Sequence, residues 1–258
     1  MKKNKLLVAN WKMELSYNQS IEWLKQYGPE LKELATTEQV ELVVCPSFTC
    51  LDYFKNYLGD TKVKLGAQDC SGHTHGSYTG QVAATSLKEL TCKYCIIGHT
   101  EWKCSINNLV HKLNEQVAQK AAILIHEGIV PIVCIGETLI EKQTGKTLEI
   151  LEQQLAQVLQ AAQASNYTQL VIAYEPVWAI GTGALPEVQE LQAICKHIKL
   201  YCAQFLDQNT IRLLYGGSVN SKNTEKWLQI PEIDGFLVGK ASLDFQELKK
   251  IVVLVSRG

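Results

Sequence analysis

Eight short apolar runs, each followed by a longer amphipathic stretch, constrain the fold of this chain more than any other feature. The runs are rich in valine, isoleucine and leucine and hardly alternate with polar residues, which is typical of parallel strands buried on both faces. They occupy residues 6–9, 42–45, 63–67, 94–97, 129–135, 170–174, 211–215 and 236–238. Eight β–α repeats in 258 residues predict either a closed (β/α)8 barrel or a doubly wound open sheet.

The stretches between the runs carry apolar residues at helical spacing. Residues 147–164 place Leu148, Leu151 and Leu155 on one stripe, and residues 187–206 repeat the pattern directly after a proline. No linker, charge block or low-complexity segment divides the sequence. We therefore expect residues 1–258 to form one domain.

The positions of the polar residues favour the barrel over the open sheet. A (β/α)8 barrel carries its chemistry at the C-terminal ends of the strands. The unusual polar residues directly follow apolar runs: Asn10, Lys12, His99, Glu101 and Glu175, with glycine-rich segments at 216–218 and 239–240. This one-sided clustering predicts an α/β fold of eight parallel strands ringed by helices.

Composition excludes several classes of partner. The net charge is −1, so no basic face is available for nucleic acid or an anionic membrane. The longest apolar run is far shorter than the roughly 20 residues of a membrane-spanning helix. Nine cysteines, an odd number, indicate reduced thiols in the cytoplasm rather than a disulfide framework. Cys92 and Cys95 form a CxxC without a second pair, which favours core packing over a metal site, so we expect no metal.

The string AYEPVWAIGTG at 173–183 is the most informative segment. A carboxylate that ends an apolar strand is well placed to act as a general base, because partial desolvation moves its pKa toward the working pH. The small residues that follow Trp178 are typical of a lid whose backbone N–H groups can reach a phosphate. Taken alone, a tight turn with a surface glutamate explains the segment about as well.

Three other features complete the predicted site. A neutral His99 could donate a hydrogen bond to a substrate carbonyl, although a lone histidine is more often a satisfied polar group. Lys12 could meet an anion, although most lysines are simply solvated. The glycine-rich segments after the seventh and eighth runs occupy the frequent phosphate site of such barrels.

These segments resemble those of the triosephosphate isomerase family from end to end. The matching strings are ANWK (9–12), GAQ (66–68), YTG (78–80), IGH (97–99), CIGE (134–137), AYEPVWAIGTG (173–183), YGGSV (215–219) and LVG (237–239). The resemblance implies a (β/α)8 or TIM barrel and a homodimer. It also implies the interconversion of dihydroxyacetone phosphate and D-glyceraldehyde 3-phosphate through an enediolate, in glycolysis and gluconeogenesis, without cofactor or metal.

The resemblance also assigns roles to individual residues. Glu175 would move the proton between C1 and C2, and His99 would be the neutral electrophile, a pairing already described for this family. Asn10 and Lys12 would bind substrate, with Glu101 as a buried partner of Lys12. Ile180 and Leu237 would close over Glu175. The phosphate-binding positions would be Gly181, Ser218, Gly239 and Lys240.

The chain departs from the family pattern at the expected dimer interface and at the rim of the site. Gln81 and Trp102 replace a glutamate and an arginine that pair with each other, and Asn107 and Asn108 stand where Gly-Glu is usual. Residues 184–186 shorten the trailing end of the lid. Lys240 replaces a glycine, and we hypothesise that its ammonium points into solvent while its N–H serves the phosphate.

Two other functions remain open from the residues alone. One is a different phosphate-binding (β/α)8 isomerase, which would explain the glycine segments but not Asn10 and Lys12 together with His99 and Glu175. The other is a catalytically idle barrel kept for binding or structure. A coupled assay with glyceraldehyde 3-phosphate separates these alternatives.

Overall fold

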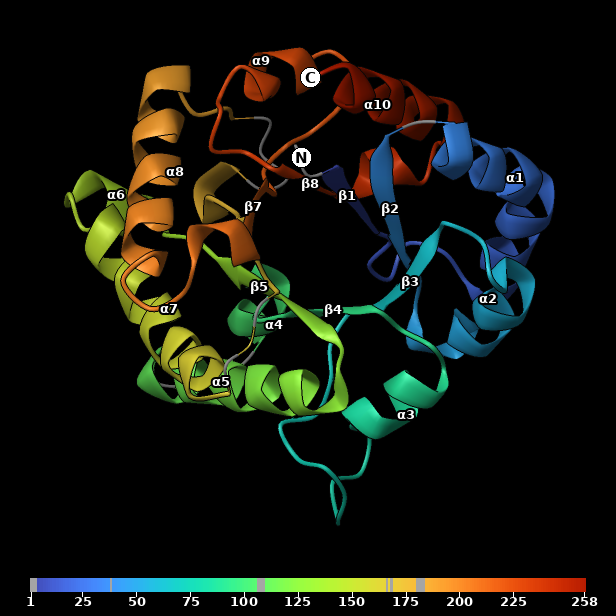
Figure 1. Cartoon of the computed structure of the whole chain (residues 1–258), viewed down its shortest axis with the longest axis horizontal. Coiled ribbons are helices and arrows are strands. Elements are labelled where there is room, and N and C mark those ends of the chain that lie inside the picture. Colours follow the sequence, from blue (N-terminus) through green and yellow to red (C-terminus); the bar gives the residue numbers. More distant parts are fainter. Residues whose placement is uncertain (1–3, 38, 106–109, 166, 168, 180–183) are drawn as a thin grey trace.

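A computed structural model describes residues 4–37, 39–105, 110–165, 167, 169–179 and 184–258. Its eight strands are parallel and close into a barrel in the order β1 to β8, with β8 paired to β1 (Figure 1). This topology confirms the predicted (β/α)8 barrel and excludes the open sheet.

Each predicted apolar run contains a strand. The strands are β1 (Lys5–Asn10), β2 (Val40–Cys45), β3 (Lys64–Ala67), β4 (Tyr94–Ile97), β5 (Val130–Ile135), β6 (Leu170–Tyr174), β7 (Ile211–Tyr215) and β8 (Gly235–Val238). Three of them, β4, β6 and β7, have the predicted bounds. The strands β1, β2 and β8 extend one or two residues beyond the runs, because backbone pairing does not stop where apolar side chains end. The strands β3 and β5 begin one residue later than predicted. Lys5 and Asn10, for example, still pair with Val40 and Cys45.

Helices surround the barrel on its outside (Figure 1). Their bounds are α1 (Tyr17–Thr37), α2 (Leu51–Leu58), α3 (Ala84–Glu89), α4 (Thr100–Ser105), α5 (Val110–Glu127), α6 (Leu139–Gln143), α7 (Thr147–Ala164), α8 (Val188–Cys202), α9 (Thr224–Leu228) and α10 (Phe245–Arg257). The helix α7 has the predicted bounds. The prediction that this helix extends to residue 206 was wrong, because α8 ends at Cys202. In the turn that follows, Phe205 N–H donates to Cys202 O, three residues back, as in a 3-10 turn.

Apolar side chains fill the barrel as well as the layer between the strands and the helices. The interior cluster contains Leu6, Val8, Val43, Cys45, Tyr94, Ile96, Val130, Ile132, Cys134, Val171, Ala173, Leu214 and Leu237. The barrel is therefore a packed core and not a pore, and it forms a firm floor for side chains at the strand ends. No helix in the described ranges is long and apolar enough to cross a membrane.

The segment between β3 and α3 projects from the body of the barrel (Figure 1). Its base is closed by a hydrogen bond from Ser71 N to Val82 O of 2.7 Å. Near its tip the rings of His73 and Tyr78 stack with centroids 3.9 Å apart. Residues 73–81 are exposed in the single chain, so the projection presents a preformed surface to solvent.

Candidate active site

Eight of the nine residues predicted for the site line one pocket of about 730 Å³ at the C-terminal ends of the strands. They are Asn10, Lys12, His99, Glu101, Glu175, Ser218, Gly239 and Lys240. The ninth, Gly181, lies outside the described residues, and so does Ile180. Leu237, expected to close over the base, also lines the pocket and is buried.

Glu175 follows β6 directly and is almost completely buried, with 1% of the residue exposed. Its backbone N–H donates to Ile135 O over 2.7 Å. A Cβ added to Gly136 would lie 1.8 Å from Glu175 O, and one added to Gly216 would lie 2.7 Å from Glu175 Cγ. Gly136 therefore provides space for the backbone of Glu175, and Gly216 provides space for its side chain.

His99 and Glu175 contact each other across the pocket. The His99 Nε2 atom lies 3.3 Å from Glu175 Oε1, and the hydroxyl of Thr100 donates to Glu175 Oε2 over 3.5 Å. His99 is 8% exposed. The two groups come from the ends of β4 and β6, so the barrel brings together side chains 76 positions apart in the sequence.

The hydrogen bonds of His99 select one tautomer. Its Nδ1 accepts from the backbone N–H of Glu101 over 3.2 Å, so the ring proton of the neutral form is on Nε2 and faces Glu175. Burial lowers the pKa of His99, but attraction to Glu175 and the hydrogen bond with it outweigh burial and raise the pKa above its usual value. A ligand that moved the carboxylate away from His99 would remove the main cause of this increase.

Lys12 is held in a backbone conformation that lysine rarely adopts, with φ at +51°. Its N–H donates to Asn10 Oδ1 over 3.1 Å, and Gln68 Nε2 donates to the Lys12 carbonyl over 2.8 Å. Its ammonium lies 2.5 Å from Glu101 Oε1. The pairing with Glu101 is as predicted, but the prediction that Glu101 is buried was wrong. Its side chain is 56% exposed in the single chain, whereas that of Lys12 is 23% exposed.

The glycine-rich segments after β7 and β8 line the same pocket as His99. Gly239 lies against Lys12: a Cβ there would be 3.4 Å from Lys12 Cε. The hydroxyl of Ser242 donates to Gly239 O over 2.7 Å, and Asn223 Nδ2 donates to Ser218 O over 2.9 Å. Carbonyl groups of both segments are thus satisfied within the protein. Lys240 is exposed at the pocket rim.

Glu137 anchors the start of the segment that leads into residues 180–183. It is completely buried and accepts hydrogen bonds from Trp178 Nε1 (2.7 Å) and from the Tyr174 hydroxyl (3.1 and 3.2 Å). Burial raises the pKa of Glu137, although these hydrogen bonds oppose the increase. The ammonium of Lys142 lies over the Trp178 ring, 3.9 Å from the ring centroid, and 2.8 Å from the carboxylate of Glu190 on α8.

Cys134 lies in β5 beside the base. Burial, and then the Glu175 carboxylate, raise the pKa of the Cys134 thiol well above its usual range. A thiol in this state is protonated and is a poor nucleophile. No group of three or more metal-ligating side chains occurs among the described residues.

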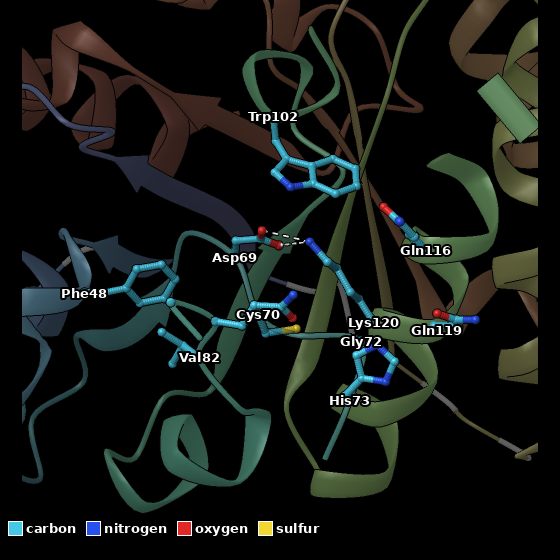
Figure 2. Close-up of a pocket in the computed structure, with 12 residues that line it drawn as sticks. Phe48, Asp69, Cys70, Gly72, His73, Val82, Trp102, Gln116, Gln119 and Lys120 are labelled. Atoms are coloured by element: carbon cyan, nitrogen blue, oxygen red, sulfur yellow. Dashed lines mark hydrogen bonds and ion pairs between the residues drawn. The ribbon is translucent and has the colours of Figure 1, made fainter. Parts of the chain in front are cut away.

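A second pocket of about 340 Å³ lies at the base of the projecting segment and contains two of the unusual residues. Figure 2 shows the Lys120 ammonium between the Asp69 carboxylate and the Trp102 ring; it lies 2.8 Å from each Asp69 oxygen and 4.0 Å from the ring centroid. Gln81 Oε1 accepts a hydrogen bond from the Ser71 hydroxyl over 2.6 Å. Trp102 is therefore accommodated by packing its indole ring on Lys120, and Gln81 by accepting a hydrogen bond from Ser71. Asn107 and Asn108 lie outside the described residues.

Sequence reasoning missed the supporting side chains. Gln68 and Glu137 lie in the strings that resemble the family, yet no role was predicted for them, and none was predicted for Thr100. Their roles depend on partners that are 56, 41 and 75 positions away in the sequence, which no local pattern reveals.

Known proteins match almost the whole chain. A sequence model of the family described as triosephosphate isomerase matches residues 5–255. The triosephosphate isomerase of Thermus thermophilus is 42% identical over 246 residues, which cover 93% of this chain and 94% of that protein. The proteins of the same name from Dictyoglomus thermophilum and Mycoplasmopsis pulmonis are 37% and 34% identical, each over 253 residues. These matches cover 97% of this chain and 99% and 97% of the two proteins.

Proposed function

The chain belongs to the triosephosphate isomerase family, and on that premise we propose that it interconverts dihydroxyacetone phosphate and D-glyceraldehyde 3-phosphate by moving a proton. The observation that carries the proposal is the facing pair of His99 and Glu175 at the ends of two strands. The pair opens onto the same pocket as Lys12 and the two glycine-rich segments.

The first step is general base catalysis by Glu175. Its carboxylate removes a proton from C1 of dihydroxyacetone phosphate, and the electron pair of that C–H bond forms the C1–C2 double bond of an enediolate. The substrate carbonyl oxygen takes the place of Glu175 as acceptor of the His99 Nε2–H, so the imidazole stabilises the developing oxyanion. Glu175 then returns its proton to C2, while the hydroxyl proton of O1 passes to O2 by way of His99 Nε2, so that O1 becomes the aldehyde oxygen and O2 the hydroxyl. No atom is gained or lost overall.

Charge stabilisation comes from Lys12, which contacts Glu101 on the same side of the pocket as His99. Lys12 places an ammonium group near the substrate anion, and Asn10 holds the backbone of Lys12 through its 3.1 Å hydrogen bond. Ser218, Gly239 and Lys240, with Gly181, bind the phosphate through backbone N–H groups. Because these contacts lie away from the reacting carbons, they orient the substrate for proton transfer.

A coupled assay with glyceraldehyde 3-phosphate tests this function. The purified chain should convert the aldehyde to the ketone without added metal or cofactor, and Glu175→Gln should abolish most of the activity. A folded wild-type chain without turnover would instead support the idle barrel. Turnover that persists in Glu175→Gln would refute the role of the base.

The exposed surface beside the pocket supports a homodimer. Met13 is 93% exposed, and Phe48 and Tyr78 are 38% and 40% exposed. These residues belong to the segment after β1, the segment after β2 and the projecting segment. A second copy of the chain would cover them, and it would also shield Glu101, whose side chain is more than half exposed beside Lys12.

Molecular mass measured against protein concentration tests the dimer. We expect a dimer of twice 28.8 kDa that dissociates on dilution, and dissociation at a higher protein concentration when Tyr78 is replaced by serine. The matched control is Leu200→Ser on α8, because Leu200 is also exposed but lies on another element. A monomer at all concentrations would refute this proposal.

We also propose that residues 1–258 form one domain and that the protein works in the cytoplasm. The barrel runs without a break in order from β1 near the beginning of the chain to β8 near its end. All eight cysteines with described side chains are free, which suits a reducing compartment.

A further inference from the structure

A side-chain amide from α7 completes the hydrogen bonding of the chain where it leaves β5. Gly136 N donates to Gln154 Oε1 over 2.9 Å, and Gln154 Nε2 donates to Gly136 O over 2.9 Å. A carboxamide can make this reciprocal pair because it carries a donor and an acceptor side by side. Gln154 therefore takes the place of a neighbouring strand at the point where the sheet ends.

A lysine from α4 reinforces the same contact. Lys103 Nζ donates to Cys134 O over 2.9 Å and to Gln154 Oε1 over 3.3 Å. The carbonyl groups of Cys134 and Gly136 are thus held by two side chains that also contact each other. We refer to Gln154 and Lys103 together as the β5 clamp.

The backbone that carries the catalytic carboxylate lies against the opposite side of this segment. Glu175 N donates to Ile135 O over 2.7 Å, and Val177 N donates to Glu137 O over 3.0 Å. Gly136 has no room for a side chain there, because an added Cβ would lie 1.8 Å from Glu175 O. Residues 135–137 are therefore enclosed between the clamp and residues 175–177.

We propose that Gln154, assisted by Lys103, is a positioning residue for the proton transfer, and this proposal rests on the proposed function. Among the described residues that line the catalytic pocket, neither member of the clamp appears. The clamp acts through the backbone: it fixes residues 134–136, which fix the backbone of Glu175 and so the distance from its carboxylate to the substrate. Close packing leaves no gap that could absorb a displacement of Gly136.

The test compares Gln154→Met with Gln153→Met. Methionine keeps the length and much of the volume of glutamine but can form neither hydrogen bond with Gly136. Gln153 is the adjacent residue on α7, is exposed, and donates its side-chain amide to Glu149 and not to β5. We expect kcat to fall by about tenfold or more in Gln154→Met, since small misplacements of a reacting group have effects of this size. Gln153→Met should retain wild-type kcat.

Binding measurements separate positioning from general damage. The affinity for inorganic phosphate, which probes the segments after β7 and β8, should change less than twofold in Gln154→Met. A variant that is merely unstable would lose phosphate binding and activity together. Lys103→Met removes one member of the clamp, so it should lower kcat by a smaller factor. The double variant should resemble Gln154→Met, because both side chains act on the same segment.

Amide hydrogen exchange tests the clamp independently of turnover. Exchange at Glu175 N and Val177 N should be faster in Gln154→Met and unchanged in Gln153→Met. If the wild-type chain does not isomerise triose phosphates, the proposed function fails while this measurement still decides whether the clamp holds the backbone. Should Gln154→Met not fold, Lys103→Met gives the same comparison. Unchanged kcat and unchanged exchange in a folded clamp variant would overturn the proposal, as would a loss of phosphate affinity equal to the loss in kcat.

Discussion

The imidazole of His99 lies 3.3 Å from the carboxylate of Glu175, and both residues are almost completely buried. Neither group can change its charge without affecting the other. Burial lowers the pKa of His99, whereas the carboxylate raises it by a larger amount. Because the pKa is raised in the folded protein, protonation of His99 contributes stability that is complete below about pH 6.5 and is lost as the pH rises through the folded-state value.

Glu175→Gln should therefore lower the pKa of His99. The variant removes the main cause that raises it and leaves burial, which favours the neutral ring. The measurement is the NMR chemical shift of the imidazole as a function of pH. Glu14→Gln is the control, since Glu14 lines the same pocket at an exposed position without a contact to His99 among the described interactions. An unchanged His99 titration in Glu175→Gln would show that the two groups are not coupled.

Glu175→Asp tests the distance rather than the charge. The shorter side chain withdraws the carboxylate from the pocket by about the length of one C–C bond, so the rate should fall at least about tenfold. The fold should change little, because the backbone bond of residue 175 to Ile135 O remains. Steady-state kinetics and circular dichroism together check this expectation, and a rate equal to that of the wild type would eliminate Glu175 as the base.

Gly216→Ala should reduce activity as well as stability. The new Cβ would stand 2.7 Å from Glu175 Cγ, so the buried side chain would have to shift. We expect kcat to fall by about tenfold while the free energy of unfolding falls by about 1–3 kcal/mol. Gly72→Ala is the control, because a Cβ there meets its nearest atom at an ordinary 3.5 Å. A stability loss without an activity loss would contradict this description of the site.

Lys120→Met should destabilise the protein. The Lys120 side chain is 8% exposed and pairs with Asp69, whose side chain is 28% exposed. Removing the ammonium therefore leaves a poorly solvated carboxylate without its partner charge. We expect a loss of roughly 2–4 kcal/mol in urea unfolding, below the value for a fully buried pair. Adding Asp69→Asn should recover part of this loss, as the uncompensated charge disappears. Equal losses in the single and double variants would mean that the charge plays no part.

The sequence predicts the barrel well because its strands are buried on both faces. Continuous apolar runs mark such strands directly, and for β4, β6 and β7 the predicted bounds match the observed ones. The residues that line the pocket were also predictable, since side chains that follow parallel strands gather at one end of a barrel. The roles that family resemblance implies for them stay predictions.

What the sequence does not reveal depends on contacts between distant segments. The positive φ of Lys12 has no local signal, because lysine rarely adopts that conformation. The exposure of Glu101 also has no local signal, since its partner Lys12 lies 89 positions away. Likewise, Trp102 reads in the sequence as the loss of an arginine, whereas the structure places its ring on Lys120, 18 positions further along. Such pairings require the folded barrel.

The most direct test of the account follows the fate of the proton. Dihydroxyacetone phosphate is incubated with the purified chain in deuterated water, and the products are examined by proton NMR. We expect signals of glyceraldehyde 3-phosphate in which the proton signal of the carbon protonated by the enzyme is missing, because that carbon carries deuterium. Glu175→Gln should form almost none of this product. Conversion that continues undiminished in Glu175→Gln, or a correctly folded wild-type chain that neither converts the substrate nor exchanges its proton, would contradict it.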